Sequence, residues 1–195
     1  TSDVNLDRQC FAWFLRSPHA HAEIVSIDTS AAKAMPGVIE ILTGEDYAND
    51  ELGLLGGGAP FKRRDGSPMY RPPRPALTRD RVRHIGQSVA VVIAESVNQA
   101  KDAAEAIEVD YSILPAHTST ANANQPGAPV IWPDCANNEA MFVNLGNAAA
   151  VDAALAGAAH VVREYFPVSR VAASAIEPRA VMAHYDDGRG HFTVY

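Results

Sequence analysis

The sequence predicts an α+β domain, and three observations within residues 82–115 carry that prediction. The run SVAVVIA at 88–94 is apolar, rich in β-branched side chains and too short for a surface helix, so it predicts a buried strand. Ser96 and Gln99 form the S-x-x-Q pattern of a capping box, which predicts that a helix begins there. Residues 107–113 alternate apolar and polar side chains, as a half-buried strand does. Strand, helix and strand within about thirty residues predict a β-α-β unit.

The N-terminal third supplies the sheet and helix surface that this unit needs as cover. Its apolar runs predict strands at 10–15, 21–27 and 38–42 and a short helix at 29–35. Asp28 is the predicted N-cap of the short helix, because a carboxylate just before a helix accepts hydrogen bonds from its first amides. Residues 43–46 (TGED) are interpreted as a turn.

Two long segments show no periodicity. Residues 49–79 are rich in glycine and proline, and so long a loop inside a compact domain is usually functional or lies against a partner. Neither Lys-Ser nor Lys-Thr follows the run Gly56-Gly57-Gly58, so we interpret it as a flexible linker and not as a phosphate-binding loop. Residues 116–138 are rich in Asn, Ala and Pro and are interpreted as a surface linker.

A second region begins at Asn144 and predicts one helix, one strand and one hairpin. The predicted bounds are 147–159 for the helix, with Asn147 as its cap, 161–166 for the strand, and 180–185 with 191–195 for a hairpin around the turn 186–190. Because the chain stops inside the second strand of that hairpin, we expect it to be part of a longer protein.

Composition and charge narrow the function classes. Apolar residues make up 47% of the 195, enough for a sizeable core, and the length suggests one domain or one and part of another. The net charge of −7 argues against a nucleic-acid partner. The one concentration of basic residues is interpreted as a solvated loop, and it comprises Lys62, Arg63, Arg64, Arg71, Arg74, Arg79, Arg81 and Arg83.

The two cysteines lie far apart. Cys10 opens an apolar run and is predicted to be a buried thiol, whereas Cys135 is predicted to lie in a loop. Without a C-x-x-C motif, this chain alone cannot assemble a zinc site or a cysteine-held iron–sulfur cluster. No signal peptide and no apolar span long enough for a bilayer is present, so we expect no membrane partner and a reducing, cytoplasmic setting.

Three groups of polar residues have both a chemical and a structural interpretation. His19 and His21 would share one face of a strand but lack a third metal ligand, so structural histidines near a turn are favoured. Residues 177–179 (EPR) favour an ion pair at the start of a strand over an acid–base pair. Residues 186–188 (DDG) hold only half of the ligand positions of a calcium loop and favour a hairpin turn. The residues alone therefore indicate a soluble α+β domain with a partner-facing loop.

Two segments also resemble a known family. Residues 14–46 (FLRSPHAHAEIVSIDTSAAKAMPGVIEILTGED) and 76–116 (ALTRDRVRHIGQSVAVVIAESVNQAKDAAEAIEVDYSILPA) resemble the α/β hammerhead domain of the molybdenum hydroxylases. This is the family of xanthine dehydrogenase, aldehyde oxidase and aerobic carbon monoxide dehydrogenase. Residues 144–161 and 175–195 resemble the opening of that family's molybdopterin-binding domain, although the family commonly has Gly-Asp where this chain has Gly146-Asn147. Asn caps a helix as well as Asp does, so we expect no structural effect.

The resemblance implies a division of the chain. The implied parts are an α/β hammerhead domain at 1–116, a linker at 117–143 and the truncated start of a molybdopterin-binding domain at 144–195. The hammerhead part is expected to pack against the cofactor domain and to shape access to it.

The resemblance also implies an oxidoreductase that hydroxylates an aldehyde, a purine or another N-heterocycle, or that oxidises carbon monoxide. Water supplies the oxygen, and electrons leave through iron–sulfur clusters, often to FAD. The implied cofactors of the complete enzyme are molybdopterin with molybdenum, as the cytosine dinucleotide, and 2Fe-2S and FAD on partner domains or subunits. The family's catalytic and pterin-binding residues lie beyond Tyr195, so we assign no catalytic, cofactor-binding or metal residue and expect no cofactor on this chain alone.

We therefore expect an N-terminal fragment of a molybdenum-cofactor subunit that is inactive by itself. Its expected partners are the remainder of that subunit and the iron–sulfur and FAD subunits or domains. The alternative is a free-standing, non-catalytic binding or scaffold module built on the hammerhead fold.

Overall fold

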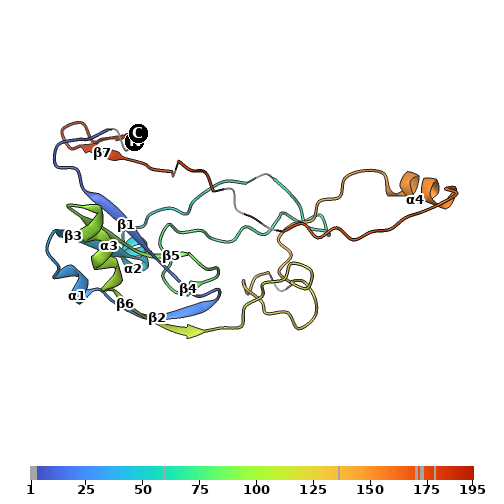
Figure 1. The fold of residues 1–195 in the computed structure, drawn as a ribbon, viewed down its shortest axis with the longest axis horizontal. Coiled ribbons are helices and arrows are strands. Elements are labelled where there is room, and N and C mark those ends of the chain that lie inside the picture. Colours follow the sequence, from blue (N-terminus) through green and yellow to red (C-terminus); the bar gives the residue numbers. More distant parts are fainter. Residues whose placement is uncertain (1–3, 59, 136, 170, 172–173, 178) are drawn as a thin grey trace. The chain divides into compact units, whose positions relative to one another are not determined.

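The computed structural model of the chain describes residues 4–58, 60–135, 137–169, 171, 174–177 and 179–195 (Figure 1). The chain forms two compact units. The large unit comprises Cys10–Asn144, and the small unit comprises Leu145–Tyr195 together with the residues that precede Cys10.

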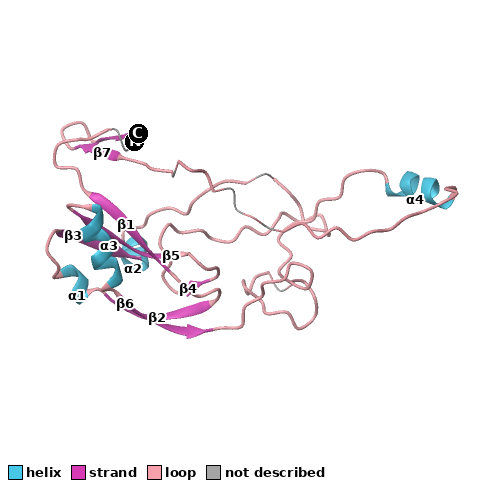
Figure 2. Cartoon of the chain, viewed as in Figure 1, coloured by secondary structure: helices cyan, strands magenta, loops and turns pink. Residues whose placement is uncertain are grey.

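The first sheet of the large unit has β5 (Ser88–Ala94) at its centre, between β1 (Phe11–Arg16) and β3 (Val38–Thr43) (Figure 2). Both ladders are antiparallel. Most side chains of β5 are buried, as its continuous apolar run predicts. The buried strand predicted at 88–94 is therefore confirmed with its bounds.

The second sheet has the order β4 (Arg81–Val82), β2 (Ala22–Asp28), β6 (Glu108–Ile113), and its ladders are also antiparallel. The predicted β-α-β unit is wrong in its topology. Its strand, helix and strand exist, but β5 and β6, which flank α3 (Val97–Glu105), lie in different sheets. Both edges of β5 are already occupied by β1 and β3, so β6 pairs with β2 instead.

Helix α3 packs on the first sheet through small side chains. Ser96 caps it as predicted, because its Oγ accepts a hydrogen bond from the Gln99 amide at 3.3 Å. The buried residues of α3 are all alanines, which allow the helix to approach the sheet closely. The core cluster between them comprises Ala32, Ile41, Ala90, Val92, Ala94, Ala100, Ala103, Ala104 and Ile107.

Two shorter helices connect the strands. The N-cap of α1 (Ser30–Lys33) is Thr29 and not Asp28, although Asp28 Oδ1 accepts a hydrogen bond from the Ser30 amide at 2.9 Å. The turn predicted at 43–46 is wrong, since a helix, α2 (Gly44–Asn49), begins there. Its start is stabilised by Asp46, whose Oδ2 accepts hydrogen bonds from the amide and from the hydroxyl of Thr43, both at 2.7 Å.

We predict that Asp46→Ala destabilises the chain by about 1 kcal/mol at neutral pH, because it removes this cap. The side-chain and backbone hydrogen bonds from Thr43 hold the pKa of Asp46 below its ordinary value of 3.8. A lowered pKa in the folded state means that the stabilisation is present above the ordinary value and is lost as the pH falls through the folded-state value. Urea unfolding of the wild type and the variant should show a difference in the free energy of unfolding near neutral pH, and this difference should become smaller in acid. A difference that is independent of pH would contradict the role given to the Asp46 carboxylate.

The small unit contains one helix and one hairpin. Asn147 Oδ1 accepts a hydrogen bond from the Ala150 amide at 3.0 Å and caps α4 (Ala148–Ala156), which ends earlier than predicted. Strands β7 (Ala183–Asp186) and β8 (His191–Val194) form the predicted hairpin. The strand predicted at 161–166 is wrong, since no described strand of the small unit pairs with it. No described residue from Leu145 onward is buried.

Candidate functional site

The segment 52–76 of the large unit, called the arm below, folds back on itself. It follows α2 and precedes β4, and its described residues form no helix or named strand, as the predicted loop requires. Its legs are joined by hydrogen bonds from Leu55 N to Arg74 O (2.8 Å), from Met69 N to Phe61 O (3.1 Å) and from Arg63 N to Ser67 O (2.9 Å). These pairs are nested around the turn at Asp65-Gly66, so the arm is an irregular hairpin and not an unstructured linker.

A second loop, 129–143, packs against the arm and is called the return loop. The Tyr70 amide donates to Ala140 O at 2.8 Å, and the Phe142 amide donates to Lys62 O at 2.9 Å. Arg64 Nε lies 3.0 Å from the carboxylate of Glu139 and donates to both of its oxygens. The return loop overlaps the surface linker predicted at 116–138, and these contacts show that it is held against the arm.

Asn138 organises the return loop from within. It has a positive φ of 54°, a left-handed conformation that Asn tolerates better than most residues. Its Oδ1 accepts a hydrogen bond from the Ile131 amide at 3.0 Å, and its Nδ2 donates to Ala123 O (2.8 Å) and Pro129 O (2.9 Å). One side chain thus satisfies three backbone groups that no helix or strand would satisfy.

A stack of cations and aromatic rings links both loops to the body of the large unit. The guanidinium carbon of Arg83, just after β4, lies 3.7 Å from the centre of the Trp132 ring in the return loop. Tyr70 of the arm lies 6.3 Å from that ring, and the Arg63 guanidinium lies 5.6 Å from the ring of Tyr70. Burial lowers the pKa of Arg83 and raises the pKa of Tyr70. The sequence predicted that the basic residues form a solvated loop. That interpretation is incomplete, because Arg83 and Arg64 hold the two loops in place.

We predict that Trp132→Ala releases the return loop, because it removes the ring that Arg83 lies over and that Tyr70 packs beside. The expected loss is about 1–3 kcal/mol for the cation–π and aromatic contacts together. Hydrogen exchange should accelerate at the amides of Tyr70 and Phe142, which bond across the two loops. Trp13→Ala is the matched control, since Trp13 lies under Lys101 at 4.6 Å on β1. Unchanged exchange at Tyr70 and Phe142 in Trp132→Ala would contradict the assignment.

The two histidines have structural surroundings. His21 is 5% exposed, and its Nδ1 lies 2.8 Å from Pro115 O. Since a carbonyl oxygen only accepts, Nδ1 carries the proton. His19 meets the ring of Tyr111 edge-on at 4.8 Å. Both observations agree with the structural interpretation favoured from the sequence. His21 also lines a cavity of about 260 Å³ with Arg81, Leu114, Pro115, Pro129 and Val130.

The burial predicted for Cys10 is found at Cys135 instead. Cys10 is exposed, so its predicted burial is wrong: it lies just before β1, outside the sheet. Cys135 is the buried thiol, 3% exposed, and its amide donates to Trp132 O at 2.8 Å. The predicted hairpin turn is present at Asp186, whose Oδ1 accepts a hydrogen bond from the Arg189 amide at 3.2 Å. The motif at 177–179 includes Pro178, which lies outside the described residues.

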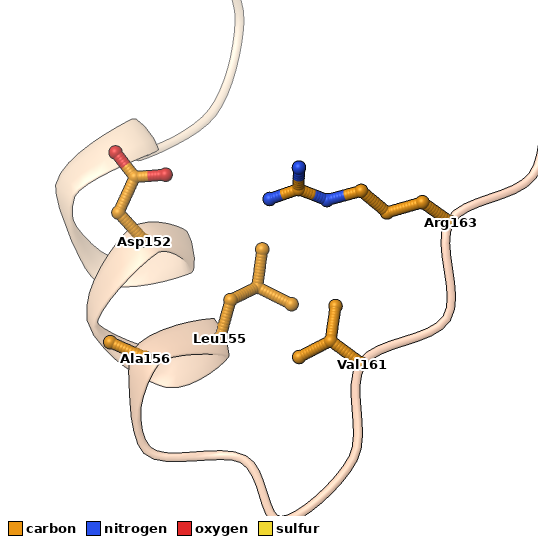
Figure 3. A pocket seen from close by; sticks show the side chains of 5 residues that line it. All are labelled: Asp152, Leu155, Ala156, Val161 and Arg163. Carbon is orange, nitrogen blue, oxygen red and sulfur yellow. The ribbon is translucent and has the colours of Figure 1, made fainter.

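The small unit has an open groove of about 570 Å³ beside α4 (Figure 3). Leu155 of α4 and Val161 of the following segment point toward one another, with Asp152 and Arg163 at one end of the groove. The lining holds no nucleophile with an adjacent base. Across the described parts of the chain, no three His, Cys, Asp or Glu side chains are grouped so that they could hold a metal ion.

This fold and these loops agree with a known class of domain. Residues 1–115 match the family described as "Aldehyde oxidase and xanthine dehydrogenase, a/b hammerhead domain". The chain belongs to this family, and the matched residues are the α/β hammerhead region of a molybdenum hydroxylase large subunit.

Individual relatives match nearly the whole chain. It is 35% identical over 187 residues to the nicotine 6-hydroxylase large subunit of Paenarthrobacter nicotinovorans, covering 95% of this chain and 22% of that protein. It is 32% identical over 205 residues to the carbon monoxide dehydrogenase large chain of Afipia carboxidovorans, covering 99% and 24% respectively. Quinoline 2-oxidoreductase from Pseudomonas putida 86 has a similar structure, with a TM-score of 0.83, 32% identity and coverage of 99% of this chain and 24% of that one. The chain thus spans about a quarter of the length of these relatives.

None of the helices in the described residues is both long and apolar enough to cross a membrane.

Proposed function

We propose that this chain is the N-terminal part of the molybdenum-cofactor subunit of an oxidoreductase. The enzyme would hydroxylate an aldehyde, a purine or another N-heterocycle, or would oxidise carbon monoxide. The observation that carries the proposal is similarity over 95% or more of the chain to large subunits of molybdenum hydroxylases about four times as long. Residues 1–116 would be the hammerhead domain, 117–143 a linker and 144–195 the start of the molybdopterin-binding domain.

The small unit supports this proposal through its exposed apolar surface. The helix α4 is built almost entirely of Ala, Val and Leu, and none of its residues is buried. A helix that is apolar on all sides belongs in the interior of a larger protein. The side chains of Tyr165, Phe166 and Val168 are at least 80% exposed, which is an unusual density of large apolar groups on a free surface. We propose that the remainder of the subunit covers them.

The cofactors of the complete enzyme are assigned to other parts of it. The described residues of this chain do not fit a metal site, since they bring no set of metal-binding side chains together. We therefore propose that molybdenum and molybdopterin, as the cytosine dinucleotide, are held by the remainder of the subunit. Iron–sulfur and FAD groups would lie on partner domains or subunits. No catalytic, cofactor-binding or metal residue is proposed within this chain, and a cytoplasmic location stays a prediction.

The role of the large unit would then be structural. Its two sheets and α3 form a core of their own, Arg83 and Trp132 hold the return loop to the end of β4, and Asn138 holds the return loop together from within. We propose that this body packs against the cofactor domain and shapes access to it.

The proposal is tested by comparing the 195-residue chain with the complete subunit, expressed together with its partner subunits. Molybdenum analysis and dye reduction with aldehydes, purines, N-heterocycles and carbon monoxide are the measurements. We expect molybdenum and dye reduction in the complete enzyme and neither in the 195-residue chain. Stoichiometric molybdenum on the short chain would refute the assignment. Absence of molybdenum from the complete protein would support the alternative, a non-catalytic scaffold module.

A further inference from the structure

We propose that the arm, residues 52–76, docks onto an acidic surface of a separate subunit of the enzyme complex. This inference rests on the proposed function, which supplies the complex, and goes beyond it by naming the docking element and the chemistry of its partner. Four properties of the arm support it: its charge, its exposed leucines, the occupied carboxylates on and beside it, and its internal rigidity.

The arm has the opposite charge to the rest of the chain. It contains the cations Lys62, Arg63, Arg64, Arg71 and Arg74 and one carboxylate, Asp65, for a net charge of +4. The whole chain carries −7, so the residues outside the arm carry −11. Interfaces place unlike charges against each other, and a basic patch on an acidic protein steers association with an acidic partner.

The arm also presents apolar side chains to solvent. Leu52, Leu54 and Leu55 are 54%, 59% and 57% exposed, and no described residue of the arm is buried. Neighbouring exposed leucines beside arginines are typical of a protein interface, whose centre is apolar and whose edge is charged. A nucleic-acid backbone would use the cations but not the leucines.

The carboxylates of Asp65, on the arm, and Glu139, beside it, already form hydrogen bonds or an ion pair within the large unit. Asp65 Oδ1 accepts hydrogen bonds from the amide and the hydroxyl of Ser67, at 2.9 and 2.6 Å. Glu139 of the return loop is paired with Arg64 at 3.0 Å. Arg63 is held over the ring of Tyr70 at 5.6 Å. Lys62 is exposed, so its charge is accessible to a carboxylate of a partner.

The arm is held in one shape before any partner binds. The hydrogen bonds between its legs, the Arg64–Glu139 pair and the bond from Arg74 Nη2 to Gly56 O at 3.3 Å all lie within the large unit. An ordered hairpin loses less conformational entropy on binding than a free loop does. This favours a docking element over a mere connection between α2 and β4.

The test uses the complete molybdenum subunit and its purified partner subunits. Lys62→Glu reverses an exposed charge on the arm, and Leu54→Ser with Leu55→Ser removes its apolar contact. Lys33→Glu is the matched control, because Lys33 is an exposed cation on α1, paired with Glu40 at 3.2 Å. The dissociation constant between subunits should rise about tenfold or more for both arm variants and stay unchanged for the control. The wild-type constant should also rise with salt, since ions screen exposed charges.

Zero-length carbodiimide coupling identifies the partner directly. It should join Lys62 to an Asp or Glu of a different subunit. Coupling to the same polypeptide, or to a second copy of it, would overturn the proposal, as would an unchanged dissociation constant in both arm variants. Unchanged thermal unfolding of the variants confirms that the substitutions act at the interface. Molybdenum content and dye reduction of the wild-type complex test the proposed function separately from the docking of the arm. If the wild-type enzyme is active but both arm variants leave the dissociation constant between subunits unchanged, only the docking proposal is overturned.

Discussion

Replacing Ile41 by Ala is expected to lower the free energy of unfolding by about 2–5 kcal/mol, the range for truncating a buried Ile in a packed core. Ile41 is 1% exposed on β3 and is the bulkiest kind of side chain in the cluster between the first sheet and α3. Its neighbours there are mostly alanines, which have no side-chain freedom to fill a cavity. Urea unfolding followed by circular dichroism measures the loss.

Ile39→Ala is the matched control for that prediction. It removes the same atoms from the same strand, two residues away, yet Ile39 is 53% exposed. In a regular strand the two residues would share a face, but the β3–β5 register shifts between Val38 and Glu40 and places Ile39 outside the ladder. We expect the control to cost less than about 1 kcal/mol. Equal losses for the two variants would contradict this account of the bulge.

Gly44→Ala is expected to lower the free energy of unfolding by about 1–3 kcal/mol, because it forces a methyl group against backbone atoms. A Cβ at Gly44 would lie 2.4 Å from both the carbonyl carbon and the carbonyl oxygen of Thr78. Neither atom belongs to a flexible side chain, so α2 or the segment before β4 must move. Thr78 is itself anchored, since its amide donates to Ser88 O at 2.9 Å and its Oγ1 accepts from Gln87 Nε2 at 2.7 Å.

Gly53→Ala controls for the intrinsic effect of the substitution. Gly53 has no atom within 4 Å of the added Cβ and no positive φ. Ala there is expected to change stability by less than about 1 kcal/mol, with a slight gain from reduced freedom of the unfolded chain. Thermal unfolding of both variants makes the comparison, and a similar midpoint for the two would refute the role of the close approach.

Several elements were predictable from the sequence because their stabilising groups are close neighbours along the chain. The caps at Ser96 and Asn147 each need one side chain and an amide three residues later. The hairpin of β7 and β8 follows from the turn-forming residues between two short apolar runs. The helix α2 shows how such a signal is missed: Thr43 and Asp46 have capping-box spacing, but Gly44 in the same stretch suggested a turn.

The candidate site was much less predictable. Its parts are Arg83, Trp132 and Asn138. Arg83 and Trp132 join segments that are distant in the sequence, and Asn138 bonds backbone groups 7 to 15 residues away in a stretch without periodicity. The only local signals were a Trp within an Asn- and Pro-rich segment and the unusual length of the loop before β4. Those signals indicate a partner-facing loop, as predicted, but not which side chains hold it.

By itself, the sequence determined the family, the strand at 88–94, the helix that Ser96 caps and the terminal hairpin. These depend on side-chain pattern and on hydrogen bonds between near neighbours, which the order of residues contains directly. Only the tertiary structure decided that β6 joins β2 and not β5, that Ile39 faces outward while Ile41 is buried, and that Cys135 is buried while Cys10 is not. Each of these outcomes depends on which strand edge is free and which surface is covered, and those conditions exist only once distant segments have packed together.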